Sequence, residues 1–245
     1  MTITLPKVAG ALALATCLSA PCVAQTTSNR SRVTITHVKP DMANEWLDLQ
    51  KSEVVPALKK AGVKTRTVYS SGLFGTAGEY LIQQPFDNMA DFDGPSPLVK
   101  ALDAPGATRL QAKLAKCVVS SNSFQATLLT DLSNQLDTPP DVTVSVRYRI
   151  TPGKTQEFQD LVKSEILPVY KKAKTNLLVF QRGPGANPAD FVMSTGYPKY
   201  ANMNGGPFLV QQLGQAGADK VNAKFAGIRT TVEVVVRRRV PDLSF

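Results

Sequence analysis

The most informative segment of this chain is EWLDLQKSEVVPALKKA at residues 45–61, because a close copy of it follows later. Residues 157–173 read EFQDLVKSEILPVYKKA, so ten of the seventeen positions are identical at an offset of 112 residues. Apolar residues recur at helical spacing in both segments, which predicts an amphipathic helix in each half of the chain. Each segment also contains a proline, Pro56 or Pro168, which removes a backbone donor and predicts a bend in the helix.

The similarity between the two halves extends well beyond this helix. GATRLQAKLA at residues 106–115 matches GADKVNAKFA at residues 217–226, and Gly72 matches Gly183. Self-similarity at one offset is the mark of a duplicated structural unit. We therefore expect two repeats, at residues 32–132 and 142–240, joined by a linker at residues 133–141.

Each predicted repeat has the order βαββαβ, which is the order of ferredoxin-like α+β folds. Apolar and polar residues alternate over 142–150, which predicts a half-buried strand before the long helix. Two further strands, a broken helical region and a last strand follow. Helices cover one face of such a sheet, and we expect the other face to be apolar and to need a partner. The predicted fold is thus two ferredoxin-like repeats packed sheet to sheet, as a pseudo-dimer within one chain.

This pattern resembles the dimeric α/β-barrel superfamily, which includes the antibiotic-biosynthesis monooxygenase-like and NIPSNAP-like domains. The resemblance depends on the βαββαβ order and on a first helix with Glu45 or Glu157 near its start and Pro56 or Pro168 near its end. The superfamily contains monooxygenases, isomerases, haem enzymes and proteins with no assigned role, so the fold does not choose among activities.

Three functional classes follow from that resemblance. The leading interpretation is an exported soluble protein that binds a small molecule or a partner. The first alternative is a cofactor-independent monooxygenase-like or isomerase-like enzyme acting on a small aromatic substrate, and the second is a haem-dependent member. Whether the protein is an enzyme stays open, and no cofactor is predicted.

The first 24 residues have the features of a signal peptide. Lys7 precedes an apolar run at residues 8–20 that is too short to cross a bilayer, and small residues end at Ala24. Cleavage there would start the mature chain at Gln25, in the periplasm or outside the cell. Cys17 offers a lipoprotein alternative, because the residues before it resemble a lipobox. No later segment predicts a transmembrane helix.

The net charge of +9 falls to +8 without Lys7 and favours attraction to small anions or anionic surfaces rather than nucleic acid in an exported protein. The densest basic run, residues 237–239, is interpreted as a solvated strand end. Cys117 would be the only cysteine of the mature chain, which excludes an internal disulfide there, and we expect its thiol to be buried. One histidine and one cysteine also argue against a zinc site. The sequence leaves association of pseudo-dimers open.

Two glutamates are the candidate catalytic residues. Glu53 and Glu165 lie three residues before the prolines, at the edge of the apolar stripe. A partly desolvated carboxylate there could accept a proton near neutral pH. The alternative is an ion pair with a neighbouring Lys or Arg.

Four further residues are candidates for ligand binding. His37, the only histidine, lies on the first predicted strand, and Arg149 takes its place in the second repeat. Trp46 and Tyr170 each occur in one repeat only, so we expect any pockets of the two repeats to differ. A serine-hydrolase triad would have to use His37, and no nucleophile-elbow motif accompanies it.

Overall fold

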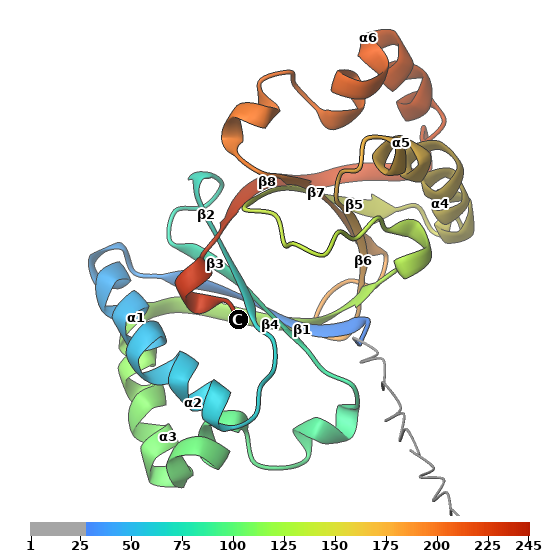
Figure 1. Cartoon of the computed structure of the whole chain (residues 1–245). Coiled ribbons are helices and arrows are strands. Elements are labelled where there is room, and N and C mark those ends of the chain that lie inside the picture. Colours follow the sequence, from blue (N-terminus) through green and yellow to red (C-terminus); the bar gives the residue numbers. More distant parts are fainter. Residues whose placement is uncertain (1–27) are drawn as a thin grey trace, which may run out of the picture.

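The fold is a closed barrel of eight antiparallel strands with a layer of helices on each of two sides (Figure 1). The computed structural model describes residues 28–245, so the expected signal peptide and Cys17 lie outside the described residues. Within the described part, no helix is long and apolar enough to cross a membrane. The predicted α+β class is confirmed.

Strands and helices alternate in the predicted order in both halves of the chain. The strands are β1 (Arg30–Val38), β2 (Thr67–Phe74), β3 (Glu79–Pro85), β4 (Val118–Leu128), β5 (Val142–Ile150), β6 (Leu177–Arg182), β7 (Asp190–Tyr197) and β8 (Arg229–Arg239). The helices are α1 (Ala43–Leu49), α2 (Val55–Lys60), α3 (Pro97–Cys117), α4 (Thr155–Leu161), α5 (Leu167–Lys172) and α6 (Phe208–Ala223).

The barrel is built from two four-stranded sheets with the same internal order. The first half is ordered β4-β1-β3-β2 and the second β8-β5-β7-β6. Hydrogen bonds between β2 and β8, and between β4 and β6, join the edge strands of the two sheets. The expected sheet-to-sheet packing is therefore wrong in one respect: the halves share a single closed sheet. Closure gives each exposed edge a partner over part of its length, which packing face to face alone would not do.

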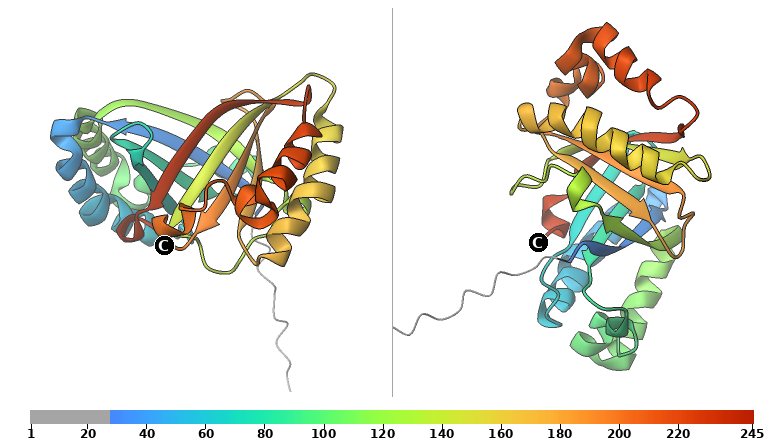
Figure 2. Two further views of the ribbon diagram at one scale, coloured as in Figure 1. Left: turned by 90° about the horizontal axis from the view of Figure 1, so that it is seen from above. Right: turned by 90° about the vertical axis from the view of Figure 1, so that its right-hand side faces the viewer.

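The helices of each half pack on the outside of their own four strands (Figure 2). Trp46, Val68, Tyr80 and Leu110 are among the residues of the first core, and Cys117 lies in it with no exposed surface. Phe158, Val179, Phe191 and Phe225 are among those of the second core. The predicted burial of Cys117 is confirmed.

The predicted bend in the repeated helix is a π-helical turn in both halves. Residues 50–54 separate α1 from α2, and residues 162–166 separate α4 from α5. The N–H groups of Val55 and Leu167 bond to carbonyls five residues back, and Pro56 and Pro168 then lie in the first turn of the next α-helix. Proline is tolerated there because its missing donor has no helical partner in a first turn. The wider turn thus accommodates the proline without ending the helix.

The tail after the last strand of each half enters the core of the other half. Leu132 lies in the second core and Leu243 in the first, and both are buried. The following serines make matching bonds: Ser133 accepts from the N–H of Val179, and Ser244 from the N–H of Val68, both at 3.0 Å. The repeated tripeptide Asp-Leu-Ser at 131–133 and 242–244 carries this exchange. The exchanged tails therefore join the two halves in addition to the strand pairing.

A buried arginine lies beside the second of these tails. Arg66 donates to the carbonyl of Leu243 at 3.2 Å and to Oε1 of Gln50 at 2.7 Å, and no carboxylate is among its hydrogen-bond acceptors in the described part of the chain. Burial lowers the pKa of Arg66 to about 10. The matching positions of the second half hold apolar residues, Leu177 and Val162.

Candidate functional site

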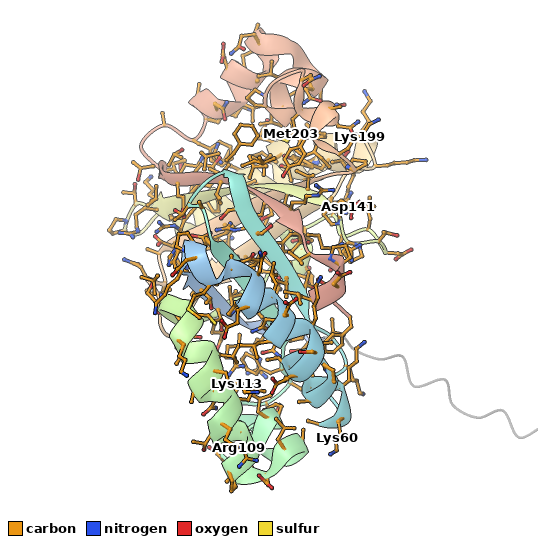
Figure 3. All side chains as sticks on the ribbon, turned by 90° about the vertical axis from the view of Figure 1, so that its left-hand side faces the viewer. Lys60, Arg109, Lys113, Asp141, Lys199 and Met203 are labelled. Atoms are coloured by element: carbon orange, nitrogen blue, oxygen red, sulfur yellow. The ribbon has the colours of Figure 1, made fainter. Side chains whose placement is uncertain are left out.

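The candidate catalytic glutamates form ion pairs on the outside of the helical layer. Glu53 pairs with Lys113 at 2.8 Å, and Glu165 pairs with Lys224 at 2.7 Å. Lys113 lies on the outer helix α3 (Figure 3), and its partner carboxylate side chain is 37% exposed. The structure thus places both glutamates in the salt bridges that were the alternative interpretation. Neither side chain lines the two cavities described below.

Two of the candidate binding residues fill the helix-facing cores. Trp46 is 1% exposed and packs on Tyr80 with ring centroids 4.3 Å apart. Tyr170 packs on Phe208 at 4.1 Å, and its hydroxyl hydrogen-bonds to Thr195 at 2.7 Å. Burial raises the pKa of Tyr170 above its ordinary value. Both side chains are therefore enclosed by their own half.

The other two candidates, His37 and Arg149, meet carboxylates on the inner face of the barrel. Side chains alternate between the helix-facing and inner faces of a barrel strand. Tyr80 packs against the helices, so its neighbour Glu79 points inward, and the same reasoning places Asp190 inside beside Phe191. The inner face was expected to be apolar, and that expectation is wrong, because it carries two buried acids and several arginines.

A hydrogen-bonded row crosses the inner face of the first half. It runs over β4, β1, β3, β2 and β8, which are consecutive neighbours in the barrel. His37 Nδ1 lies 3.0 Å from Ser120 Oγ, and its Nε2 lies 3.2 Å from Glu79 Oε2. Glu79 Oε1 accepts from Ser71 at 3.3 Å and from Arg237 at 2.8 Å. Arg237 is 6% exposed, so the solvated strand end expected at residues 237–239 is wrong for this residue.

A second row occupies the matching positions of the other half. Asp190 is 1% exposed and bonds to Arg149 and to Arg147, whose Nη1 lies 3.1 Å away. Arg182 lies 3.7 Å from the same carboxylate. Burial alone would raise the pKa of Asp190, but hydrogen bonds from Arg149 and Arg147 outweigh it and hold the pKa below its ordinary value. Both rows thus centre on an acid whose partners are cationic or polar.

A small apolar cluster shares the inner face with these rows. Val33, Phe124 and Ala126 are its buried members, and Phe180 packs against them. The guanidinium of Arg182 lies over the ring of Phe124, 3.9 Å from its centroid, which links the cluster to the second row.

The largest cavity described lies outside the barrel, between the end of α6 and strands β5 and β8. It has a volume of about 420 Å³ and is lined by Tyr148, Asn222, Phe225, Ala226, Arg229 and Thr231. We call it the Arg229 cavity. Its volume is within the range of small-molecule sites, about 300–1,000 Å³.

Arg229 is held between two aromatic rings at this cavity. Its guanidinium carbon lies 4.1 Å from the ring centroid of Tyr148 and 3.9 Å from that of Phe225. Its Nη2 donates to Asn222 Oδ1 at 3.2 Å, and its Nη1 approaches the sulfur of Met193 at 3.9 Å. Burial lowers the pKa of Arg229. In the part of the chain described, its partners are neutral, so its charge is stacked and oriented but not compensated by a carboxylate.

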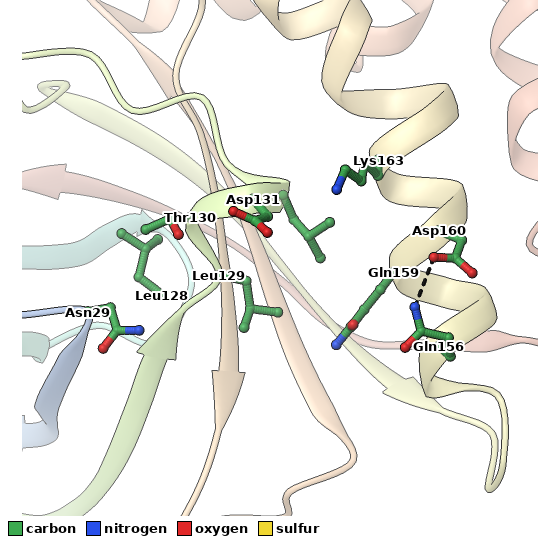
Figure 4. Close-up of a pocket in the computed structure, with 10 residues that line it drawn as sticks. Asn29, Leu128, Leu129, Thr130, Asp131, Gln156, Gln159, Asp160 and Lys163 are labelled. Atoms are coloured by element: carbon green, nitrogen blue, oxygen red, sulfur yellow. Dashed lines mark hydrogen bonds between the residues drawn. The ribbon is translucent and has the colours of Figure 1, made fainter.

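A second cavity, of about 350 Å³, lies between α4 and the tail that follows β4 (Figure 4). Asp131, Asp160 and Lys163 line it, and Gln156 donates to Asp160 at 2.9 Å. At the matching place in the first half, Lys51 and Asp242 form an ion pair at 2.8 Å. The charges around this second cavity are of both signs, so it has no single preference for an ion.

The structure does not provide a metal cluster. Among residues 28–245, no group of three or more His, Cys, Asp and Glu side chains is arranged to hold a metal ion. Nor does His37 fit an axial ligand to haem iron, because both of its ring nitrogens already have partners within the row.

Three residues of these sites were missed by the sequence reasoning. Glu79 and Asp190 lie at matching positions, an offset of 111 residues, so the repeat itself could have identified them as a recurring acid. Arg229 has no arginine at its matching position, Val118, and no sequence signal distinguishes it from the other basic residues.

Comparisons with known proteins identify the fold only. No protein-family model and no curated protein matches the chain. Among solved structures, a proposed monooxygenase from Lactobacillus acidophilus is 10% identical with a TM-score of 0.56, covering 88% of this chain and 94% of its own. An anthrone oxidase-like protein is 13% identical with a TM-score of 0.55, covering 86% and 91%. A heme-binding protein from Thermus thermophilus is 11% identical with a TM-score of 0.51, covering 87% and 92%. The chain therefore has the fold of the dimeric α/β-barrel proteins.

Proposed function

We propose that this protein binds a small, flat, anionic molecule, such as an aromatic carboxylate, in the Arg229 cavity. The observation that carries the proposal is the guanidinium of Arg229, which is stacked between Tyr148 and Phe225 on the cavity wall and has only neutral partners among the described residues. A fixed guanidinium matches the planar geometry of a carboxylate and can donate two parallel hydrogen bonds to it.

The aromatic walls and the charge of the chain support the same ligand class. Tyr148 and Phe225 provide ring faces for a flat group, and Asn222 offers a polar contact on the cavity wall. A net charge of +9 for the whole chain attracts anions over longer distances and raises their local concentration.

The cavity belongs to one half only, which supports a ligand specific to the second half. The positions that match Tyr148, Asn222, Phe225 and Arg229 hold Thr36, Gln111, Leu114 and Val118. Neither an arginine nor an aromatic ring is present at those positions to hold a flat anion. This asymmetry fits the expectation that the two halves differ in what they bind.

Isothermal titration calorimetry tests the proposal, with benzoate as the probe and benzyl alcohol as its uncharged counterpart. Benzoate is expected to bind and benzyl alcohol to bind more weakly, since only the carboxylate pairs with the guanidinium. Arg229→Met should weaken benzoate binding by about 10- to 100-fold, the value of a charge-assisted hydrogen bond. Arg109→Met is the matched control, because Arg109 is an exposed arginine on α3 of the other half (Figure 3). Equal benzoate affinity in Arg229→Met and the unmodified protein would refute the proposal.

Enzymatic use of the same cavity is the second candidate. It is favoured by the shared fold with a proposed monooxygenase and an anthrone oxidase-like protein. An aromatic substrate ionised as a carboxylate or phenolate would meet Arg229 in the same way as a bound ligand. Oxygen uptake with phenolic substrates, compared between the unmodified protein and Arg229→Met, separates turnover from binding alone.

We also propose that the chain arose by tandem duplication and is exported after cleavage at Ala24. The repeats at 32–132 and 142–240, with the linker at 133–141, are supported by the common strand order and by the matching tail contacts of Ser133 and Ser244. Mass spectrometry of the protein from a periplasmic fraction tests the export proposal. A mature chain that starts at Gln25 is the expected result, whereas a lipid-modified Cys17 would contradict it.

A further inference from the structure

We propose that Ser120, His37 and Glu79 form a nucleophile, base and acid relay that hydrolyses small carboxylic esters at the end of the barrel. The three side chains belong to adjacent strands, β4, β1 and β3, where Ser120 pairs with His37 and His37 with Glu79 in the strand register. The sheet thus brings together three residues, of which Glu79 and Ser120 lie 42 and 83 positions after His37 in the chain. This is a different site from the Arg229 cavity and does not depend on the function proposed above.

The distances suit proton transfer from Ser120. His37 Nδ1 lies 3.0 Å from Ser120 Oγ, and His37 Nε2 lies 3.2 Å from Glu79 Oε2. A carboxylate beside Nε2 keeps the proton on that nitrogen, which leaves Nδ1 with a lone pair toward the hydroxyl. The nitrogens have exchanged the roles that they take in serine proteases, but the logic of base and orienting acid is the same.

Glu79 is held in place as an orienting acid should be. Its side chain is 8% exposed, and its second oxygen accepts hydrogen bonds from Arg237 at 2.8 Å and from Ser71 at 3.3 Å. Arg237 is itself buried on β8. These contacts favour the ionised carboxylate and fix its direction, so Arg237 and Ser71 act as positioning residues.

Ser120, by contrast, is exposed, and the strand beside it has an open edge. β4 pairs with β1 from Thr127 to Val118, but with β6 only over residues 126–128. Gln125 bonds across the second edge to Pro184 and Gly183, so alternation directs the N–H of Ser121 toward the same edge. Along residues 118–123 no described strand covers that edge. The N–H of the residue after a nucleophile is a usual donor to the oxyanion in serine hydrolases.

The reaction is balanced with water as the only co-reactant. Ser120 Oγ attacks the ester carbonyl carbon while its proton passes to His37 Nδ1, and the N–H of Ser121 stabilises the oxyanion. The carbon–oxygen bond of the ester then breaks, and the alcohol leaves with the proton from His37. Water, deprotonated by His37, attacks the acyl-Ser120 ester, releases the carboxylic acid and restores Ser120. The open surface beside Ser120 favours a short acyl group.

The second half of the chain offers an internal comparison. At the positions that match Ser120, His37 and Glu79 it has Thr231, Arg149 and Asp190. Arg149 keeps the ion pair with the acid but is always protonated, so it cannot accept a proton from a hydroxyl. The relay is therefore restricted to the first half.

The test uses a fluorophosphonate probe, which labels activated serines, together with hydrolysis of p-nitrophenyl acetate. Peptide mass spectrometry should find the label on Ser120, and hydrolysis should show an initial burst from the acyl-enzyme. Ser120→Ala and His37→Arg should each reduce kcat/KM by at least about 100-fold, the usual contribution of a positioned base. His37→Arg copies the second half and so keeps an ion pair to Glu79 while removing the base.

Ser123→Ala is the matched control, because Ser123 is another exposed serine of β4 whose hydroxyl contacts Thr34 at 2.8 Å instead of His37. It should retain kcat/KM within about twofold of the unmodified protein, since its hydroxyl has no neighbouring base. Thermal melts confirm that each variant is folded. Labelling of a different residue, absence of labelling, or full activity in folded Ser120→Ala would each overturn the proposal.

Discussion

Replacing the two exchanged leucines by alanine should destabilise the whole barrel. Leu243 has no exposed surface and Leu132 is 5% exposed, yet each lies in the core of the half that does not contain it in sequence. Truncation of a buried leucine to alanine costs about 3–5 kcal/mol, through lost burial and the cavity that remains. For a chain of this size, such a loss lowers Tm by about 10 °C. Leu243→Ala should have the larger effect, since its site is the more completely buried.

Differential scanning calorimetry measures both variants, and the number of transitions is as informative as their midpoint. Because each tail completes the other core and the strands form one barrel, we expect one transition that shifts as a whole. Leu213→Ala on α6 is the control, because that leucine is 39% exposed and should lose much less stability. Two separate transitions with only one of them shifted would refute the reasoning, as would a shift no larger than that of the control.

Three further predictions concern charges and ionisable groups. Glu53→Gln and Glu165→Gln should each change the free energy of unfolding by less than about 1 kcal/mol in chemical denaturation, because they break ion pairs at the protein surface. Arg66→Leu combined with Gln50→Val should leave Tm unchanged or raised, whereas Gln50→Val alone should lower it by leaving a buried guanidinium underpaired; a lower Tm in the double variant than in the single would contradict this. Burial raises the pKa of Tyr69 to about 12, so its contribution to stability is complete below about pH 10, the pKa of an unfolded tyrosine, and is lost as pH rises toward 12. Ultraviolet titration of Tyr69→Phe should lack a tyrosinate step near pH 12, and an unchanged titration curve would contradict the assignment.

The fold was largely predictable because it depends on periodic patterns. Apolar residues at helical spacing and alternating strand residues specify which face of each element is buried, and the repeat at 45–61 and 157–173 shows that one arrangement recurs. Closure of the barrel was not predictable in the same way. The bonds between β2 and β8 and between β4 and β6 form between residues distant in sequence and leave no periodic signal. The exchanged tails did leave a signal, the repeated Asp-Leu-Ser, but it is short.

The candidate site was predicted less well, because its chemistry depends on which inner-face residues meet. Glu53 and Glu165 were favoured by their place beside the prolines, and their ion pairs with lysines become visible only when the helices are packed. His37 and Arg149 were identified by their matching positions, but the acids that bind them, Glu79 and Asp190, are on strands that become neighbours only in the folded sheet. Pairings across a sheet follow from register, which the sequence of one strand does not contain.

The central claim, that the Arg229 cavity holds a flat anion, is tested most directly by a crystal structure with 4-bromobenzoate. The account predicts an anomalous bromine peak within the cavity lined by Tyr148 and Phe225, with the carboxylate hydrogen-bonded to the guanidinium of Arg229. A bromine peak between α4 and the tail after β4, on the inner face of the barrel, or only at surface lysines would contradict it.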